Sequence, residues 1–160
     1  DICFIPNGDY ASFILNRTGK EPQNGSFLDS NGNIIGTHSG ALNYTIGQRR
    51  GLKMGFGERL YVISKNAKEN TVTLGTDQML YAKRLNVKNV NMLVDGERPD
   101  SMRIKAKVRY RMNEQDATLF FESAENAVLE FDSPQRAFTP GQSAVFYDGD
   151  VVLGGGIIEG

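Results

Sequence analysis

One run of ten residues, RIKAKVRYRM at positions 103–112, constrains the fold more than any other part of this sequence. Basic and largely apolar residues alternate in it without a break, which is the pattern of a β-strand with one cationic face and one inward face. Side chains on one face of a strand repeat every ~6.6 Å, a spacing that suits neighbouring phosphates of an RNA strand. An edge strand kept from aggregating by its charges shows the same pattern. Both interpretations stay open on the pattern alone.

The rest of the chain also favours a mainly β protein. Its 18 glycines separate short apolar runs, which is typical of many strands joined by turns. We expect a short helix at residues 9–15, and hairpins at residues 27–35, around an Asn-Gly pair, and at residues 60–74. Strand signals lapse at residues 76–83, where we expect a domain boundary. Beyond it, short strands at regular spacing predict a small sandwich or barrel, with strands at 84–90, 102–111, 118–122, 127–131, 143–147 and 151–158.

Charge and composition limit the function. The formal net charge of -1 gives no global basic field, so any contact with nucleic acid must come from a local patch. No window approaches the roughly 18 apolar residues that a membrane span needs, and the first residues lack the features of a signal peptide. We therefore expect a cytoplasmic setting and no membrane partner. One cysteine and one histidine exclude an internal disulfide, and a four-ligand zinc site without carboxylates.

Several short motifs are candidates for a site. The segment at 45–52, TIGQRRGL, places two adjacent arginines between glycines that let a partner approach the backbone, although adjacent arginines are usually only solvated. His38 has no nucleophile or second ligand nearby in sequence, so we assign it no catalytic role. Gln142, at the edge of the loop TPGQS, has an amide that can donate to a phosphate or a base. The glycine triple at 154–156 does not lead from a strand into a helix, so it predicts no phosphate-binding loop.

Cys3 is the only thiol, and it lies in an apolar run at the start of the chain. A lone cysteine in such a run is usually a small core residue. Acting as a nucleophile or sulfur carrier would require an exposed thiol with a lowered pKa. The start at Asp1, followed at once by apolar residues, looks like the middle of a larger protein.

Taken together, five motifs in order resemble the tRNA-specific 2-thiouridylase family. They are DICFI at 1–5, GTHSG at 36–40 leading into YTIGQRRGL at 44–52, AKVRYR at 106–111, TPGQS at 139–143, and FYDGD with LGGG at 146–156. The resemblance covers essentially the whole chain and corresponds to the later half of the family's sequence. It implies a small α+β central domain followed by a β-barrel resembling the second domain of elongation factor Tu. The implied division is 1–7 as the tail end of a catalytic domain, 8–80 as the central domain and 81–160 as the barrel.

The resemblance also implies an activity. Family members activate C2 of the wobble uridine, position 34, in tRNAs of the Lys, Glu and Gln type with ATP and Mg²⁺, and then replace its oxygen by sulfur. Cys3 matches the family's second cysteine, which carries a persulfide supplied by a cysteine desulfurase and sulfur-relay proteins. The ATP site and the first cysteine match nothing here, so the isolated fragment is expected to be inactive. Family tRNA contacts match Arg109, Tyr110 and Gln142.

Two other functions stay open. The first is a non-catalytic RNA-binding barrel of a translation factor, for which the basic strand suffices and Cys3 is an ordinary apolar residue. The second is a protein-interaction module, in which the charged strand is only a protected edge. Transfer of a sulfur atom to Cys3, and salt-dependent binding of tRNA, distinguish the family function from both.

Overall fold

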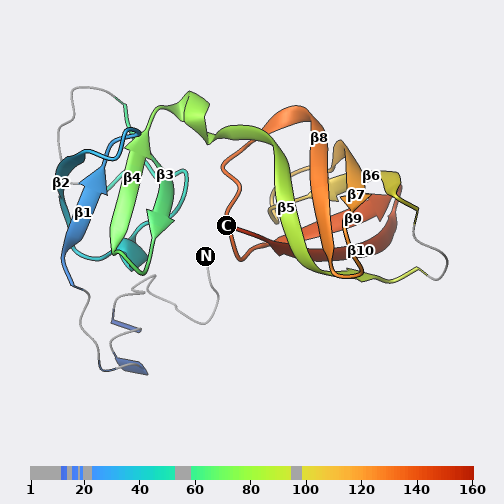
Figure 1. The fold of residues 1–160 in the computed structure, drawn as a ribbon, viewed down its shortest axis with the longest axis horizontal. Coiled ribbons are helices and arrows are strands. Elements are labelled where there is room, and N and C mark those ends of the chain that lie inside the picture. The colour runs from blue at the N-terminus through green and yellow to red at the C-terminus, as the bar shows by residue number, and fades with distance from the viewer. Residues whose placement is uncertain (1–11, 14–15, 18, 20–22, 53–58, 95–98) are drawn as a thin grey trace. The chain divides into compact units, whose positions relative to one another are not determined.

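A computed structural model describes residues 12–13, 16–17, 19, 23–52, 59–94 and 99–160 of the chain (Figure 1). The chain divides into two compact units, Asp1–Leu80 and Tyr81–Gly160. Of the helix expected at residues 9–15, Ser12 and Phe13 are described and are helical, and the remainder lies outside the described residues. Nowhere in the described ranges is a helix long and apolar enough to cross a membrane.

The first unit contains a four-stranded sheet in the order β2-β1-β4-β3. Both expected hairpins are confirmed, since β1 pairs antiparallel with β2, and β3 with β4, while β1 and β4 run parallel. One face of the sheet buries an apolar cluster that includes Phe27, Val62 and Val72, each fully buried. The elements are β1 (Gly25–Leu28), β2 (Ile34–His38), the 3-10 helix η1 (Ala41–Asn43), β3 (Tyr61–Asn66), β4 (Thr71–Gly75) and the 3-10 helix η2 (Asp77–Leu80).

Asp29 explains why the first hairpin turns where it does. Its carboxylate accepts hydrogen bonds from the backbone N–H groups of Asn31 and Asn33, at 2.8 and 2.9 Å, and from the Asn33 side chain at 2.9 Å. Gly32 takes a φ of 88°, which a residue without a Cβ adopts at little cost. The Asn-Gly signal therefore marked the turn correctly, and the aspartate before it holds the loop closed.

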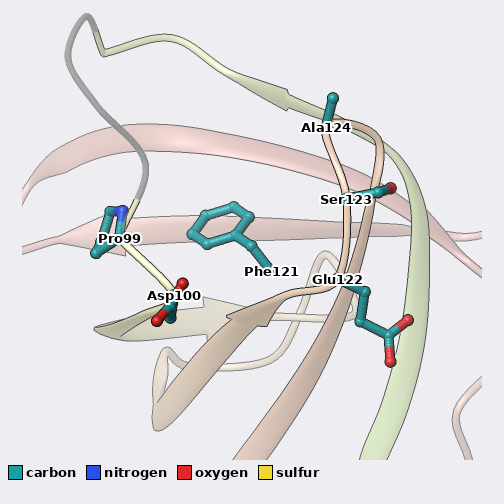
Figure 2. A pocket seen from close by; sticks show the side chains of 6 residues that line it. All are labelled: Pro99, Asp100, Phe121, Glu122, Ser123 and Ala124. Atoms are coloured by element: carbon teal, nitrogen blue, oxygen red, sulfur yellow. The ribbon is translucent and has the colours of Figure 1, made fainter.

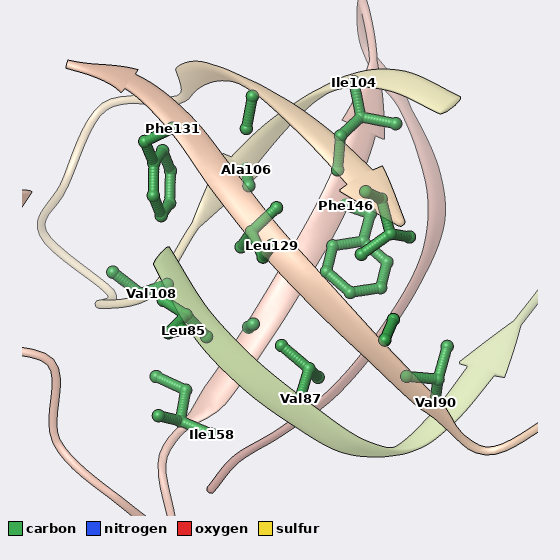
Figure 3. Packing of buried hydrophobic residues seen from close by; sticks show 14 of the residues in the cluster. Leu85, Val87, Val90, Ile104, Ala106, Val108, Leu129, Phe131, Phe146 and Ile158 are labelled. Carbon is green, nitrogen blue, oxygen red and sulfur yellow. The ribbon is translucent and has the colours of Figure 1, made fainter. Parts of the chain in front are cut away.

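The second unit is a closed barrel in the order β10-β5-β8-β7-β6-β9. All six strands expected after the boundary are present, so the prediction of a mainly β protein with a small barrel is confirmed. Apolar residues of all six strands fill the interior, where Leu129, Phe131 and Phe146 are almost completely buried (Figure 3). The strands are β5 (Tyr81–Met92), β6 (Ser101–Lys107), β7 (Gln115–Phe121), β8 (Asn126–Arg136), β9 (Ser143–Asp148) and β10 (Val151–Ile158).

Strand β6 contains the basic run, and the structure corrects two expectations about it. The alternation holds inside the strand, because Ile104 and Ala106 are buried while Arg103 and Lys105 face outward. The strand ends at Lys107, however, so the expected strand over 102–111 is too long at its C-terminal end. The edge-strand interpretation is wrong, because β6 pairs with β7 on one side and β9 on the other. Closure of the barrel leaves this strand no free edge.

The glycine triple lies inside β10 and allows close packing of that strand against β5. A Cβ on Gly154, whose φ is 156°, would lie 2.3 Å from the Asn91 carbonyl oxygen, and a Cβ on Gly156 would lie 2.5 Å from Val87 Cγ1. Both distances are far below van der Waals contact. The triple therefore serves packing of the barrel, consistent with its failure to match a phosphate-binding loop.

Candidate nucleic-acid interface

Two of the outward-facing basic residues of β6 form ion pairs with acidic side chains, so the strand does not present a continuous unpaired positive face. The guanidinium of Arg103 donates to both carboxylate oxygens of Asp132, at 2.8 and 2.9 Å. Lys107 Nζ lies 2.8 Å from Glu114 Oε1. Hydrogen bonds from these cations lower the pKa of Asp132 and of Glu114, so both carboxylates stay charged near neutral pH. The expectation of an all-cationic face along this strand is therefore wrong for Arg103 and Lys107.

Arg109, beyond the end of β6, turns toward the barrel instead of outward. Its Nη2 donates to the backbone carbonyl of Arg136 at 2.6 Å and to the carbonyl of Ala137. Burial, and then the charge of Arg136, lower the pKa of Arg109, although a guanidinium stays protonated in proteins. Ala137 follows β8 with a φ of 55°, an unusual conformation for a residue with a Cβ. Arg109 thus ties the β6–β7 turn to the segment that leads from β8 to β9.

This anchored turn presents Tyr110 and Arg111 to solvent. The Tyr110 side chain is 98% exposed, and Arg111 is exposed beside it. Exposure this complete in a large aromatic residue contributes nothing to the core, and it leaves both ring faces open for stacking. The turn therefore combines an accessible aromatic ring with a neighbouring cation, which is the composition of a surface that binds unpaired bases and phosphates.

Gln142 lies at the same end of the barrel as Tyr110. Lys107, the last residue of β6, pairs with Val145 near the start of β9, so the β6–β7 turn and the segment before β9 are adjacent. The Gln142 side chain is exposed, while its backbone is fixed by hydrogen bonds to Thr139 O, at 3.2 Å, and from Ile158 N, at 2.8 Å. The fold thus places the three residues that match family tRNA contacts at one end of the barrel, although 32 positions separate Tyr110 and Gln142 (142 minus 110).

The opposite end of the barrel differs in charge. A shallow pocket of about 240 Å³ lies there, between the start of β6 and the end of β7 (Figure 2). Its lining includes the acidic residues Asp100 and Glu122 and the ring of Phe121. Negative side chains at this end disfavour a phosphate backbone. A nucleic-acid interface on the barrel is therefore better placed at the Tyr110 end.

Cys3 lies outside the described residues, so its surroundings stay a prediction. His38 is described, and it is buried in the first unit with 4% of its surface exposed. Its Nδ1 accepts a hydrogen bond from Gly40 N at 3.0 Å, and the rings of Phe27 and Tyr44 meet it edge-on, 4.9 and 5.3 Å between centroids. No hydrogen bond to its Nε2 is present within the described residues. His38 is therefore a packed core histidine.

We expect the first unit to lose stability in mild acid because of His38. Burial lowers the pKa of His38 below the 6.5 of an exposed histidine, and the Ser26 backbone offsets only part of this. Below pH 6.5 the unfolded chain binds a proton that the folded unit does not, so stability falls until the pH reaches the folded pKa. Urea unfolding at pH 8 to 5, followed by NMR signals of β1 and β4 amides, measures this. The variant His38→Gln should show a flatter profile, and an equally steep one would contradict the assignment.

Comparison with known proteins identifies the relatives of this chain. Residues 82–158 match the family model described as an aminomethyltransferase beta-barrel domain, and residues 11–76 match that of a tRNA methyl transferase PRC-barrel domain. Over 99% of its length the chain is 45% identical to tRNA-specific 2-thiouridylase MnmA of Acetivibrio thermocellus, 43% to that of Clostridioides difficile and 39% to that of Clostridium acetobutylicum. It spans 44 to 45% of the length of these relatives. The chain is therefore homologous to part of the tRNA-specific 2-thiouridylases.

Proposed function

We propose that this chain is the tRNA-holding and sulfur-carrying part of a tRNA-uridine 2-sulfurtransferase acting at C2 of the wobble uridine. The observation that carries the proposal is 45% identity to a curated 2-thiouridylase along 99% of the chain. One family model is described as an aminomethyltransferase beta-barrel domain and the other as a tRNA methyl transferase PRC-barrel domain. The relatives that are similar over 99% of the chain are instead 2-thiouridylases. The tRNA partners proposed are those of the Lys, Glu and Gln type.

The chemistry proposed divides between Cys3 and a second part of the protein. At a site outside these 160 residues, the C2 oxygen of uridine forms a bond to the α-phosphorus of Mg²⁺-bound ATP, and pyrophosphate leaves. The terminal sulfur of a Cys3 persulfide forms a bond to C2, and AMP leaves with the oxygen. A second cysteine, also outside this chain, attacks Cys3 Sγ, breaks the S–S bond and forms a disulfide, which an external thiol reduces. A cysteine desulfurase and relay proteins supply the next sulfur.

At the barrel we assign three different tasks to the three matched residues. Tyr110 stacks on an unpaired base, and Gln142 donates to a phosphate or base from a fixed backbone. Arg109 holds the turn through the carbonyls of Arg136 and Ala137, and so acts on tRNA through Tyr110. The complete exposure of Tyr110 on a turn tied down by a half-buried arginine supports this division.

Sulfur loading of Cys3 tests the proposal on the chain itself. Incubation with a cysteine desulfurase and cysteine should add the mass of one sulfur atom to the protein, and a thiol reductant should remove it. The assignment is unambiguous because the chain has one cysteine. A non-catalytic RNA-binding barrel of a translation factor would instead acquire no sulfur. An unchanged mass, while Cys3 reacts fully with a thiol-specific alkylating reagent, would rule out the carrier role.

A further inference from the structure

The loop at residues 45–51, here called the double-arginine loop, is organised around the side chain of Gln48. Its Oε1 accepts from Thr45 N at 2.9 Å, and its Nε2 donates to Arg50 O at 2.9 Å. The backbone N–H of Gln48 also donates to Thr45 O at 2.9 Å. One side chain therefore ties both ends of the loop together, which lowers its conformational freedom.

The sheet of the first unit anchors this loop. Gly47 N donates to Val62 O at 2.8 Å, and Val62 N donates to Gln48 O at 2.9 Å, so the loop continues the hydrogen bonding of β3. Val62 is fully buried and cannot shift without disturbing the core. Gly47 and Gly51 have φ values of 86° and 79°, which residues with a Cβ rarely adopt. The loop conformation is thus specified by glycine, glutamine and core contacts together.

This loop presents two arginines that form no ion pair with any of the described residues. Both Arg49 and Arg50 are exposed. A third cation lies close by, because Lys65 Nζ donates to the carbonyl of Tyr44, the residue before the loop, at 3.1 Å. In a surface evolved only for solubility, neighbouring like charges are costly and are usually interspersed with carboxylates.

The charge of the first unit also differs from that of the barrel. By sequence, residues 1 to 80 hold eight Lys and Arg against seven Asp and Glu, a difference of +1. Residues 81 to 160 hold ten Lys and Arg against twelve Asp and Glu, a difference of -2. The two units therefore carry small formal charges of opposite sign, and the double-arginine loop supplies two of the eight cations of the first unit.

We propose that the double-arginine loop is a second tRNA contact, in which Arg49 and Arg50 bind the phosphodiester backbone. This inference rests on the proposed function, since it takes tRNA as the partner. Guanidinium groups bind phosphate oxygens bidentately, and a preformed loop loses little entropy on binding. Backbone contacts carry no sequence information, so the loop fixes the position of the tRNA and does not select its bases.

Binding of an unmodified tRNA transcript to the chain over a range of salt concentrations tests the inference. In the double variant Arg49→Gln, Arg50→Gln, affinity should fall roughly tenfold or more, and the log-log salt slope should flatten by about 1.4 to 1.8. The matched control, Arg84→Gln with Arg103→Gln, removes two cations that are already paired with Glu130 and Asp132. It should leave affinity and slope nearly unchanged. Gln48→Ala keeps both charges but loosens the loop, so affinity should fall while most of the slope remains.

The outcomes separate this inference from the proposed function. If the double variant binds tRNA with the affinity and slope of the unaltered chain while Tyr110→Ala binds weakly, the loop contact is refuted and the barrel interface stands. If the double variant and the matched control lose affinity equally, the effect is one of net charge and the loop contact is likewise refuted. If the unaltered chain does not bind tRNA at all, both ideas fail together. Thermal unfolding of each variant checks that its fold is intact.

Discussion

Replacing Cys3 by serine in the enzyme that includes the adenylating part should abolish formation of 2-thiouridine. Sulfur transfer needs a side chain that accepts a sulfane sulfur, presents it to an activated carbon and is regenerated by disulfide exchange. A hydroxyl has neither the nucleophilicity nor the redox chemistry for these steps. The rate of adenylation and the affinity for tRNA should stay within about twofold of those of the unaltered enzyme, because in the proposed function these steps use other residues. Mass spectrometry of nucleosides from tRNA measures the product, and release of pyrophosphate measures activation.

A structural cysteine would give a different result in the same experiment. If Cys3 were only a buried core residue, serine would cost roughly 1 to 3 kcal/mol of stability where its hydroxyl lacks a partner, and the folded fraction would still thiolate tRNA. Cys3→Ala serves as the matched control, because it removes the thiol without introducing a polar group. Both variants should be inactive and folded. A folded serine variant that makes 2-thiouridine at the normal rate would refute the persulfide assignment.

The strands of the barrel were predictable because their signals are local. Alternating apolar residues and glycine-rich turns predicted each strand, and β10 was predicted with its observed ends. Strand β8 continues five residues beyond its expected end, from Phe131 to Arg136, through Pro134. Proline has no N–H to donate to a neighbouring strand, so it is usually confined to strand edges and bulges. Pro134 lies at such an irregularity, where the register of β8 with β5 shifts between Ala82 and Arg84. That shift depends on the partner strand, so the local sequence could not reveal it.

The surroundings of the basic strand were not predictable, because they depend on register and closure. Asp132 meets Arg103 across 29 positions of sequence, and only the placement of β7 between β6 and β8 brings them together. Pairing of β6 with β9 closes the barrel and removes the edge that the alternative interpretation required. Periodicity indicated which residues face outward. It did not indicate which acidic side chains pair with these residues.

The candidate site was predictable in part. Family motifs pointed to Arg109, Tyr110 and Gln142, and the fold gathers these residues at one end of the barrel. The inward turn of Arg109 had no sequence signal, because its acceptors are backbone carbonyls at the end of a distant strand. No local pattern indicated the hydrogen bonds that organise the double-arginine loop, since one glutamine side chain bonds to both ends of the loop. The role of Cys3 stays a prediction.

Substituting Tyr110 by alanine should weaken binding of tRNA by roughly 10- to 100-fold, since stacking of one base on an aromatic ring contributes about 1 to 3 kcal/mol. The free energy of unfolding should not change, because the side chain is 98% exposed. The salt slope should not change either, because no charge is removed. Filter binding of a tRNA transcript, with urea unfolding of the same protein, measures all three quantities.

The double-mutant cycle with Arg109→Ala distinguishes a positioning arginine from a phosphate contact. Removing Arg109 leaves the carbonyls of Arg136 and Ala137 without their charged donor, which should destabilise the barrel by about 1 to 3 kcal/mol and free the turn that presents Tyr110. If Arg109 acts through Tyr110, the double variant should bind tRNA no more weakly than the weaker of the two single variants, and the salt slope should stay the same. If Arg109 instead bonds a phosphate, the two losses should add and the slope should flatten by about one unit. Additive losses with a flattened slope would therefore refute the positioning role. Non-additive losses with an unchanged slope are the expected result, because the guanidinium is already committed to two backbone carbonyls.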